Sequence, residues 1–173
     1  MKIIQLIPRL PRAAEHDFFA AVCRELERSG DTVRILSLLP GPVTPPGVPF
    51  SALPERLLPW PGAGRSPELL ADLREYCRDA DLLHLHGALL YPLRYAAAIR
   101  REFSCKVAWS PGESGGGLLR LCGPLRRAAV DFLLARTPDE QRCFANGSFC
   151  RAPEKVPEWP AFYRKLIEGH PHD

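Results

Sequence analysis

Two imidazoles stand two residues apart at the end of an apolar run, in the segment DLLHLHG. His84 and His86 share one face of an extended strand, because strand side chains alternate between two faces. Gly87 permits a sharp turn after them. We predict that His86 is a catalytic group and that His84 and Gly87 contact a bound substrate. The alternative is that helices cover both imidazoles and the backbone satisfies them. A third ligand for a metal ion is absent, so we expect no metal site.

A glycine-rich segment, SPGESGGG, follows the next apolar run at residues 110–117. Exposed amides in such a loop bind anions, and a following helix N-terminus assists them. The segment lacks both G-x-G-x-x-G and G-K-[ST], so we expect no dinucleotide or ATP cofactor. Glu113 is its only carboxylate and the candidate general base, while Ser110, Gly112 and Ser114 are candidate substrate contacts. A plain flexible loop is the alternative.

Further candidates follow the first and fifth apolar runs. Arg9 and Arg12 suit a diphosphate or another anionic group of a substrate. Glu15 is a third candidate contact, although its place at a helix start, where the helix dipole favours a carboxylate, explains it equally well. Thr137 opens Thr-Pro-Asp-Glu, a capping box with proline at the first helical position, and is the last candidate contact.

All of these residues follow the elements that the apolar pattern predicts. We expect strands at residues 3–7, 32–39, 81–86, 105–110, 130–135 and 150–156. We expect helices at residues 14–29, from 66 onward, and at 88–101, 118–128, 137–146 and 160–168. Short, continuous apolar strands are typical of parallel strands covered on both faces. The pattern therefore predicts an α/β fold: a single Rossmann-like, doubly wound domain, with a mostly parallel sheet of about six strands and helices on both faces. In such sheets the loops at the carboxyl ends of the strands build the ligand crevice.

The 173 residues fit one domain, which we assign to residues 1–173. Eight prolines and four glycines in residues 40–64 exclude a helix or a central strand there and indicate a long loop. We assign residues 157–173 to a C-terminal tail that contains the helix expected at residues 160–168. Its aromatic residues Trp159, Phe162 and Tyr163 either cover apolar surface of the domain or form a dimer interface.

Composition narrows the classes of partner. Six cysteines include no C-x-x-C pair, and we expect reduced thiols rather than a disulfide framework. The net charge of +3 comes from mixed charges, so we expect no nucleic-acid partner. No apolar run approaches the roughly 20 residues of a membrane span, so we expect a soluble, cytoplasmic protein. The second half of the chain contains six arginines: Arg120, Arg126, Arg127, Arg136, Arg142 and Arg151. They form either a solvated face or a patch that contacts the inner face of a membrane peripherally. Such a membrane would carry an anionic lipid acceptor.

Taken in order, the segments resemble the N-terminal domain of family-four glycosyltransferases, which have the two-domain GT-B fold. The opening MKIIQLIPRLPRAAEHDFFAAVCRELERSGDTVRILSL resembles that family's first strand, loop, long helix and second strand. DADLLHLHGALLYPLRYAAAIRREFSCKVAWSPGE is similar to its third strand with the H-x-H-G turn, the next helix and the fourth strand. AAVDFLLARTPDEQRCF and PEKVPEWPAF take the places of its fifth strand with the following helix and of its final strand.

The resemblance implies that this chain binds the acceptor in glycan or lipid-linked sugar biosynthesis. In the family, a C-terminal domain binds the nucleotide sugar, and transfer occurs in the cleft between the domains without a metal. This sequence contains no such second domain, has Arg12-Ala13-Ala14 where the family carries glycines, and has no histidine in Ser110-Pro111-Gly112-Glu113. We therefore expect transfer only with a separate donor-binding subunit or as a homodimer. The alternative is a non-catalytic binding or scaffold module that descends from a glycosyltransferase.

Overall fold

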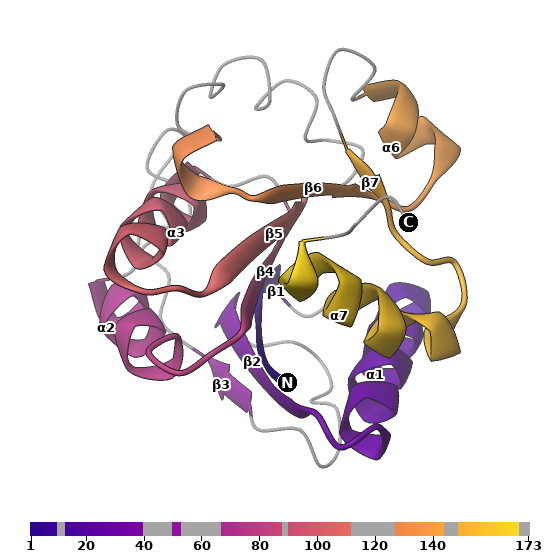
Figure 1. Ribbon diagram of the computed structural model, residues 1–173, viewed down its shortest axis with the longest axis horizontal. Helices are drawn as coiled ribbons and strands as arrows, with labels where there is room; N and C mark the ends of the chain where they lie inside the picture. The colour runs from indigo at the N-terminus through magenta and orange to yellow at the C-terminus, as the bar shows by residue number, and fades with distance from the viewer. Residues whose placement is uncertain are drawn as a thin grey trace.

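The computed structural model describes residues 1–9, 13–39, 50–52, 67–87, 90–111, 127–143 and 149–169. At residues 8–9, 13–17, 38–39, 50–52, 67, 90 and 143 it describes the backbone alone. Within these residues seven strands form one sheet in the order β3-β2-β1-β4-β5-β6-β7 (Figure 1). All of the strand pairs are parallel. The predicted α/β, doubly wound fold with a parallel sheet is confirmed.

The strands are β1 (Lys2–Arg9), β2 (Thr32–Leu39), β3 (Phe50–Ala52), β4 (Leu82–His86), β5 (Lys106–Ser110), β6 (Phe132–Ala135) and β7 (Cys150–Arg151). The described helices are α1 (Ala13–Arg28), α2 (Pro67–Tyr76), α3 (Leu90–Glu102), α6 (Pro138–Cys143) and α7 (Trp159–Glu168), with a short 3-10 helix (Val156–Glu158) before α7. The expected helix at 118–128 and the expected helix end at 146 lie outside the described residues, except that residues 127–129 are helical.

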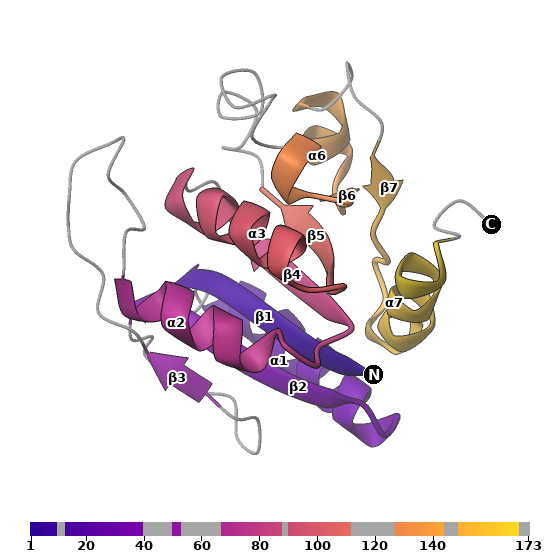
Figure 2. The same cartoon turned by 60° about the vertical axis from the view of Figure 1, so that its left-hand side comes forward.

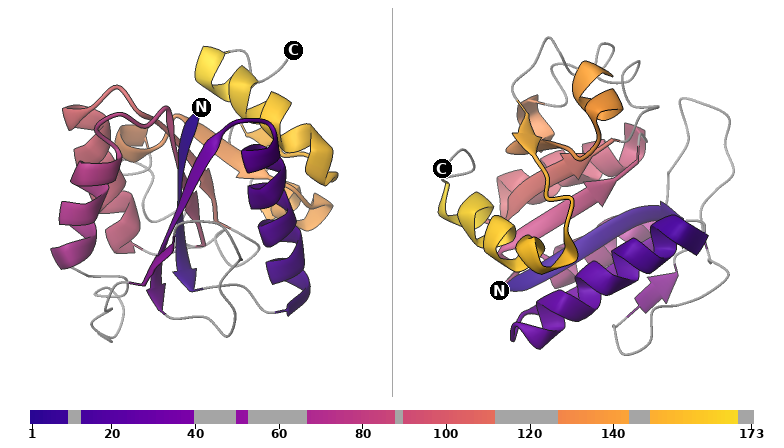
Figure 3. Two further views of the ribbon diagram at one scale, coloured as in Figure 1. Left: turned by 90° about the horizontal axis from the view of Figure 1, so that it is seen from below. Right: turned by 90° about the vertical axis from the view of Figure 1, so that its right-hand side faces the viewer.

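Helices cover both faces of the sheet. Figures 1 and 3 show α2 and α3 on one side of the strands and α1 and α7 on the other. Figure 2 shows α2 and α3 side by side, and residues of these two helices contact each other. Two buried layers result, because strands that are covered on both faces direct apolar side chains to each.

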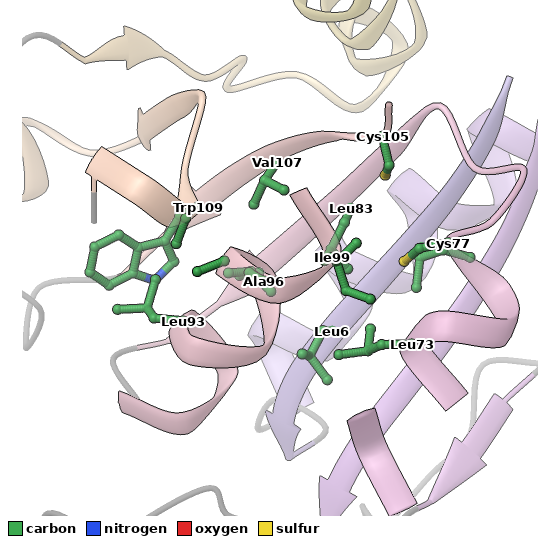
Figure 4. Packing of buried hydrophobic residues seen from close by; sticks show 14 of the residues in the cluster. Leu6, Leu73, Cys77, Leu83, Leu93, Ala96, Ile99, Cys105, Val107 and Trp109 are labelled. Atoms are coloured by element: carbon green, nitrogen blue, oxygen red, sulfur yellow. The ribbon is translucent and has the colours of Figure 1, made fainter. Parts of the chain in front are cut away.

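Among the described side chains of the layer beneath α2 and α3, one aromatic residue is fully buried among aliphatic side chains. Trp109 of β5 is 1% exposed and lies beside Leu93 of α3, while Ile99 of the same helix lies beside Leu83 of β4 (Figure 4). The thiols of Cys77 and Cys105 belong to the same layer and are free. The predicted reduced state therefore holds for the four cysteines whose side chains the structure describes: Cys23, Cys77, Cys105 and Cys150.

The opposite layer joins the first and the last described helices. The buried apolar residues of α1 recur with a helical spacing of three and four residues: Phe19, Val22, Cys23 and Leu26. Those of α7 follow the same spacing: Trp159, Phe162, Tyr163 and Leu166. The tail aromatics thus cover the sheet of their own chain, which was one of the two predicted roles. Gly169 ends α7 with φ +85°, a left-handed conformation that glycine adopts without strain.

An ion cluster fixes α7 near the amino end of the sheet. The side chain of Asp31 is 3% exposed, and its carboxylate accepts two charged hydrogen bonds. One comes from the guanidinium of Arg164 in α7, with an N···O distance of 3.3 Å, and the other from the amino group of Met1, at 2.7 Å. The nearly complete burial of its carboxylate strengthens both contacts relative to a surface pair. The cluster therefore connects β1, the start of β2 and the tail helix.

One expectation about the proline-rich segment was wrong. We predicted a loop throughout residues 40–64, but β3 pairs with β2 in parallel, with Phe50 opposite Ile35 and Ala52 opposite Ser37. Its three residues lie between Pro49 and Pro54, and β3 forms an edge of the sheet. An edge strand tolerates flanking prolines because one of its sides needs no ladder hydrogen bonds. The other residues of that segment lie outside the described part of the chain.

Smaller differences concern element ends. β6 begins at Phe132 rather than at residue 130, and β7 contains two residues rather than the expected seven. The tail helix begins at Trp159, one residue before the expected start. Among the described helices, none combines the length and the apolar character that crossing a membrane requires.

Candidate functional site

The carboxyl ends of β4 and β5 place two polar side chains next to each other. His86 and Ser110 are partners in the parallel register, and both are partly exposed. Partners in register point to the same face, so the imidazole and the hydroxyl are neighbours at the edge where α/β sheets bind ligands. The structure therefore brings together two of the predicted site residues.

The turn after β4 is held by β5. Gly87 has φ +76°, which favours glycine, and its N–H donates to the carbonyl of Ser110 at 2.8 Å. The carbonyl of Gly87 accepts from the indole N–H of Trp109 at 2.8 Å. Together these bonds fix the backbone immediately after His86.

His84 lies two residues before His86 on the same face of β4, and α7 covers it. Its side chain is 0% exposed; Nδ1 lies 2.7 Å from the hydroxyl oxygen of Tyr163, and Nε2 lies 2.9 Å from Oγ of Ser110. The indole ring of Trp159 stacks on the imidazole with a centroid separation of 6.2 Å. A ligand would reach His84 only if α7 moved. The alternative reading of a helix-covered histidine fits this residue, although side chains rather than the backbone satisfy it.

Gln5 of β1 connects the two histidines to the tail helix. It is 1% exposed and lies opposite His84 in the register. Its Nε2 donates to the hydroxyl oxygen of Tyr163 at 3.1 Å, and its Oε1 lies 2.7 Å from Nε2 of His86. Because an amide oxygen only accepts, Nε2 of His86 carries the hydrogen of that bond.

Both imidazoles are neutral at ordinary pH. Burial, and then the positive charge of Arg136, lower the pKa of His86 from 6.5 to about 3. Burial, and then the neighbouring His86, lower the pKa of His84 well below 6.5. Burial raises the pKa of Tyr163 above 10, so its hydroxyl stays protonated. A neutral His86 whose Nε2 is protonated has an unprotonated Nδ1, which accepts hydrogen bonds.

Arg136 brings a cation to this edge from the end of β6. Its guanidinium lies 4.6 Å from the ring centroid of Phe18, and Phe19 contacts the His86 ring edge-on at 5.5 Å. Guanidinium stacking on an aromatic ring is favourable. The partly exposed His86 is thus bordered by an aromatic and a cationic side chain.

The capping box at the start of α6 is confirmed. The backbone N–H of Glu140 donates to Oγ1 of Thr137 at 3.1 Å. In return, Oε2 of Glu140 accepts from the backbone N–H of Thr137 at 3.1 Å and from the backbone N–H of Arg136 at 2.6 Å. Thr137 therefore has a structural role, and contact with an acceptor stays a prediction for it.

Several predicted site residues have no described side chain. Arg12, Gly112, Glu113 and Ser114 lie outside the described residues, and for Arg9 and Glu15 only the backbone is described. Where side chains are described, no three His, Cys, Asp or Glu residues are grouped so as to hold a metal ion.

Sequence reasoning overlooked three contributors to the site. Gln5 is the one polar residue inside the apolar run Ile3-Ile4-Gln5-Leu6-Ile7, and that irregularity was an available signal. Arg136 follows a predicted strand, but it was counted among the surface arginines. No local pattern links Tyr163 to His84, because 79 positions separate them in the sequence.

No protein-family model and no curated protein sequence matches this chain. Several solved structures resemble its fold. HepE of Anabaena, solved with UDP and glucose, superposes with a TM-score of 0.58 at 14% identity. The match covers 86% of this chain and 42% of the HepE chain, so this chain spans less than half of that protein.

A form of sucrose-phosphate synthase from Thermosynechococcus elongatus superposes with a TM-score of 0.59 at 12% identity, over 97% of this chain and 98% of that chain. An alpha-glucosyltransferase solved with UDP and DNA has a TM-score of 0.50 at 11% identity, over 80% of this chain and 37% of that chain. At these identities the likeness establishes the fold alone. The chain has the Rossmann-like α/β fold that occurs in GT-B glycosyltransferases.

Proposed function

We propose that this chain is a glycosyltransferase-like, acceptor-binding domain, and that a separate donor-binding subunit or a second copy of the chain completes the transfer site. The observation that carries the proposal is the pairing of His86 and Ser110 at the carboxyl edge of a sheet shared with glycosyltransferases. A neutral imidazole beside a hydroxyl offers hydrogen bonds without introducing a charge. Such a pair suits the hydroxyl of a sugar or lipid-linked sugar acceptor.

The low pKa of His86 favours binding over strong base catalysis. A general base is most effective when its pKa lies near the working pH. With a pKa of about 3, His86 is a hydrogen-bond acceptor that orients a hydroxyl rather than the group that removes its proton. Glu113, on the segment after β5, remains the proposed general base.

The fold corresponds to only part of two of the similar solved proteins. This chain spans 42% of the HepE chain and 37% of the alpha-glucosyltransferase chain. In the GT-B arrangement that the sequence resembles, donor and acceptor domains face each other across a cleft. Cytoplasmic location and contact with the inner face of a membrane belong to the same proposal, because polysaccharide and lipid-linked sugar assembly supply acceptors there.

A specific observation favours the second candidate, a non-catalytic binding or scaffold module. His84, a predicted acceptor contact, is completely buried beneath Trp159 and Tyr163. A chain that has closed part of its crevice with its own tail could retain the fold and lose the reaction. The two candidates differ in whether a saccharide binds through His86.

Binding to an array of mono-, oligo- and polyprenyl-linked saccharides tests the proposal. We expect one acceptor class to bind saturably and His86→Ala to weaken it by about tenfold, the worth of one net hydrogen bond. Glu113→Ala should reduce transfer once a donor-binding partner is added. Arg78→Ala is the matched control. Arg78 is exposed and precedes β4, at the amino ends of the strands, so this variant should leave binding unchanged.

Titration with UDP-glucose provides the complementary test. The isolated chain should neither bind nor hydrolyse it. Turnover of a nucleotide sugar by the chain alone would contradict the need for a partner. Absence of saccharide binding, or binding that His86→Ala does not change, would favour the scaffold module.

A further inference from the structure

Five side chains from three strands and the tail helix form one unbranched hydrogen-bonded chain. It runs from His86 through Gln5, Tyr163 and His84 to Ser110, with separations of 2.7, 3.1, 2.7 and 2.9 Å. The three inner members are 0–1% exposed, so water does not compete for their hydrogen bonds. Only the two ends are partly exposed, and both ends lie at the candidate site.

Such a chain has two possible directions. Each neutral imidazole has one donor and one acceptor nitrogen, an amide has one of each at its two ends, and a hydroxyl donates one hydrogen. In the forward direction, His86 donates from Nε2 to Gln5, Gln5 donates to Tyr163, Tyr163 donates to Nδ1 of His84, and His84 donates to Ser110. In the reverse direction every one of these bonds is inverted. The two halves of the chain share one direction when the Tyr163 hydroxyl accepts from one neighbour and donates to the other.

The separations fit the forward direction. The 3.1 Å between Nε2 of Gln5 and the hydroxyl oxygen of Tyr163 lies within the range of an N–H···O bond. The reverse direction would also bring two nitrogens, Nε2 of His86 and Nε2 of Gln5, to 2.7 Å. That separation is the short limit even for N–H···O.

We propose that Tyr163 is a positioning residue that fixes the direction of this chain, so that the site edge presents Nδ1 of His86 as an acceptor and the hydroxyl of Ser110 as a donor. A ligand hydroxyl both donates and accepts, so this pair is complementary to it. The identity of that ligand rests on the proposed function, whereas the direction of the chain does not. Tyr163 acts through Gln5 and His84 and does not itself line the edge.

Tyr163 occupies the position in the chain where the direction is decided. Its oxygen accepts from Gln5 and its hydrogen goes to His84, so both neighbours depend on one hydroxyl. Without that hydroxyl, the amide of Gln5 is free to turn over, and each orientation of the amide demands a different tautomer of His86. Docking of α7 therefore sets the hydrogen-bonding character of His86 through Gln5 and that of Ser110 through His84.

The tautomers are measured directly by long-range ¹H–¹⁵N NMR of the histidine side chains in the ligand-free chain. We expect His84 and His86 to be neutral and protonated at Nε2 in the wild type. Tyr163→Phe retains the ring and removes the hydroxyl; His86 should then populate both tautomers. Tyr76→Phe removes a hydroxyl from the face beneath α2 and should leave both histidines unchanged. A wild-type His86 protonated at Nδ1, or one that keeps its tautomer in Tyr163→Phe, would overturn the proposal.

Gln5→Met provides a second variant should Tyr163→Phe fail to fold. It breaks the chain between Tyr163 and His86, so His86 should lose its tautomer preference while His84 stays protonated at Nε2. The assigned direction is overturned if both histidines keep their tautomer preference in Gln5→Met. It is also overturned if both histidines lose it. Because these measurements need no ligand, their failure is distinct from failure of the proposed function. If the proposed function holds as well, Tyr163→Phe should weaken acceptor binding by up to about tenfold without changing affinity for any donor.

Discussion

Two imidazoles on the same face of β4 meet different surroundings. His84 lies beneath α7 and has hydrogen-bond partners on both ring nitrogens. His86, two residues further along, is partly exposed, and in the described part of the chain only its Nε2 has a partner. Two positions along β4 therefore distinguish a structural histidine, His84, from a histidine that is available to a ligand, His86.

The lowered pKa values make stability depend on pH. Between pH 6.5 and about 3 the unfolded chain binds a proton at His86 that the folded chain does not, and His84 adds to the effect. The free energy of unfolding should therefore fall on acidification below pH 6.5, by at most about 1.4 kcal/mol per pH unit for each imidazole.

Urea unfolding at several pH values measures this slope. His86→Gln keeps an N–H for Gln5 but cannot titrate, so its slope between pH 6.5 and 5 should be shallower than that of the wild type. Equal slopes in the two proteins would show that His86 is not held neutral by the fold.

The capping box makes a second prediction at the residue scale. Thr137→Ala removes the oxygen that accepts from Glu140, and should lower the free energy of unfolding by about 1 kcal/mol. Thr137→Ser keeps that oxygen and should retain most of the stability. If acceptor binding falls in Thr137→Ala beyond what the stability loss explains, Thr137 contacts the acceptor as well as capping α6.

At the scale of elements, α7 determines that His84 is covered. Its apolar stripe covers His84, and Arg164 pairs with the nearly buried Asp31. α1 packs beside it, with Phe18 contacting Trp159 edge-on at 6.4 Å. The tail helix is thus part of the core rather than an appendage.

Leu166→Ala tests the docking of α7. Leu166 is 0% exposed, so its truncation should cost about 2–5 kcal/mol. Glu168→Ala, an exposed change in the same helix, should stay within about 0.5 kcal/mol of the wild type. Urea unfolding monitored by circular dichroism measures both.

Chemical modification adds a local measurement to the same pair of variants. Diethyl pyrocarbonate should modify His84 slowly in the wild type and in Glu168→Ala, and faster in Leu166→Ala, because opening of α7 exposes the imidazole. Rapid modification of His84 in the wild type would contradict the buried position.

For the whole molecule, the two buried layers share one sheet. Leu83 and Leu85 of β4 face α2 and α3, while Leu82 and His84 face α1 and α7. Neither layer can lose its packing without exposing the strands on which the other depends. We therefore expect one cooperative unfolding transition.

Tryptophan fluorescence tests this cooperativity, since Trp109 and Trp159 lie in opposite layers. In variants that keep only one of them, with the other and Trp60 replaced by phenylalanine, fluorescence and far-UV circular dichroism should give the same urea midpoint. Separate midpoints in the Trp159 variant would mean that α7 detaches before the sheet unfolds.

The sequence predicted most of the elements because their signals are local. Residues 32–39 were placed correctly to the residue, because a mainly apolar segment follows Gly30, which ends the preceding helix. The end of α1 was indicated by Gly30, which has φ +81°. β3 was missed because three residues between prolines carry no periodic signal, and their pairing with β2 is a long-range contact.

By itself, the sequence determined the alternation of strands and helices, the parallel sheet and the end of the sheet at which polar side chains gather. These features depend on the spacing of apolar residues and on capping residues, which are properties of neighbouring positions. Only the tertiary structure decided which of those side chains a ligand can reach. The contacts that bury His84 and set the tautomer of His86 join residues 158 and 79 positions apart. Hydrogen-bond direction depends on which groups meet in space, and no spacing along the chain encodes it.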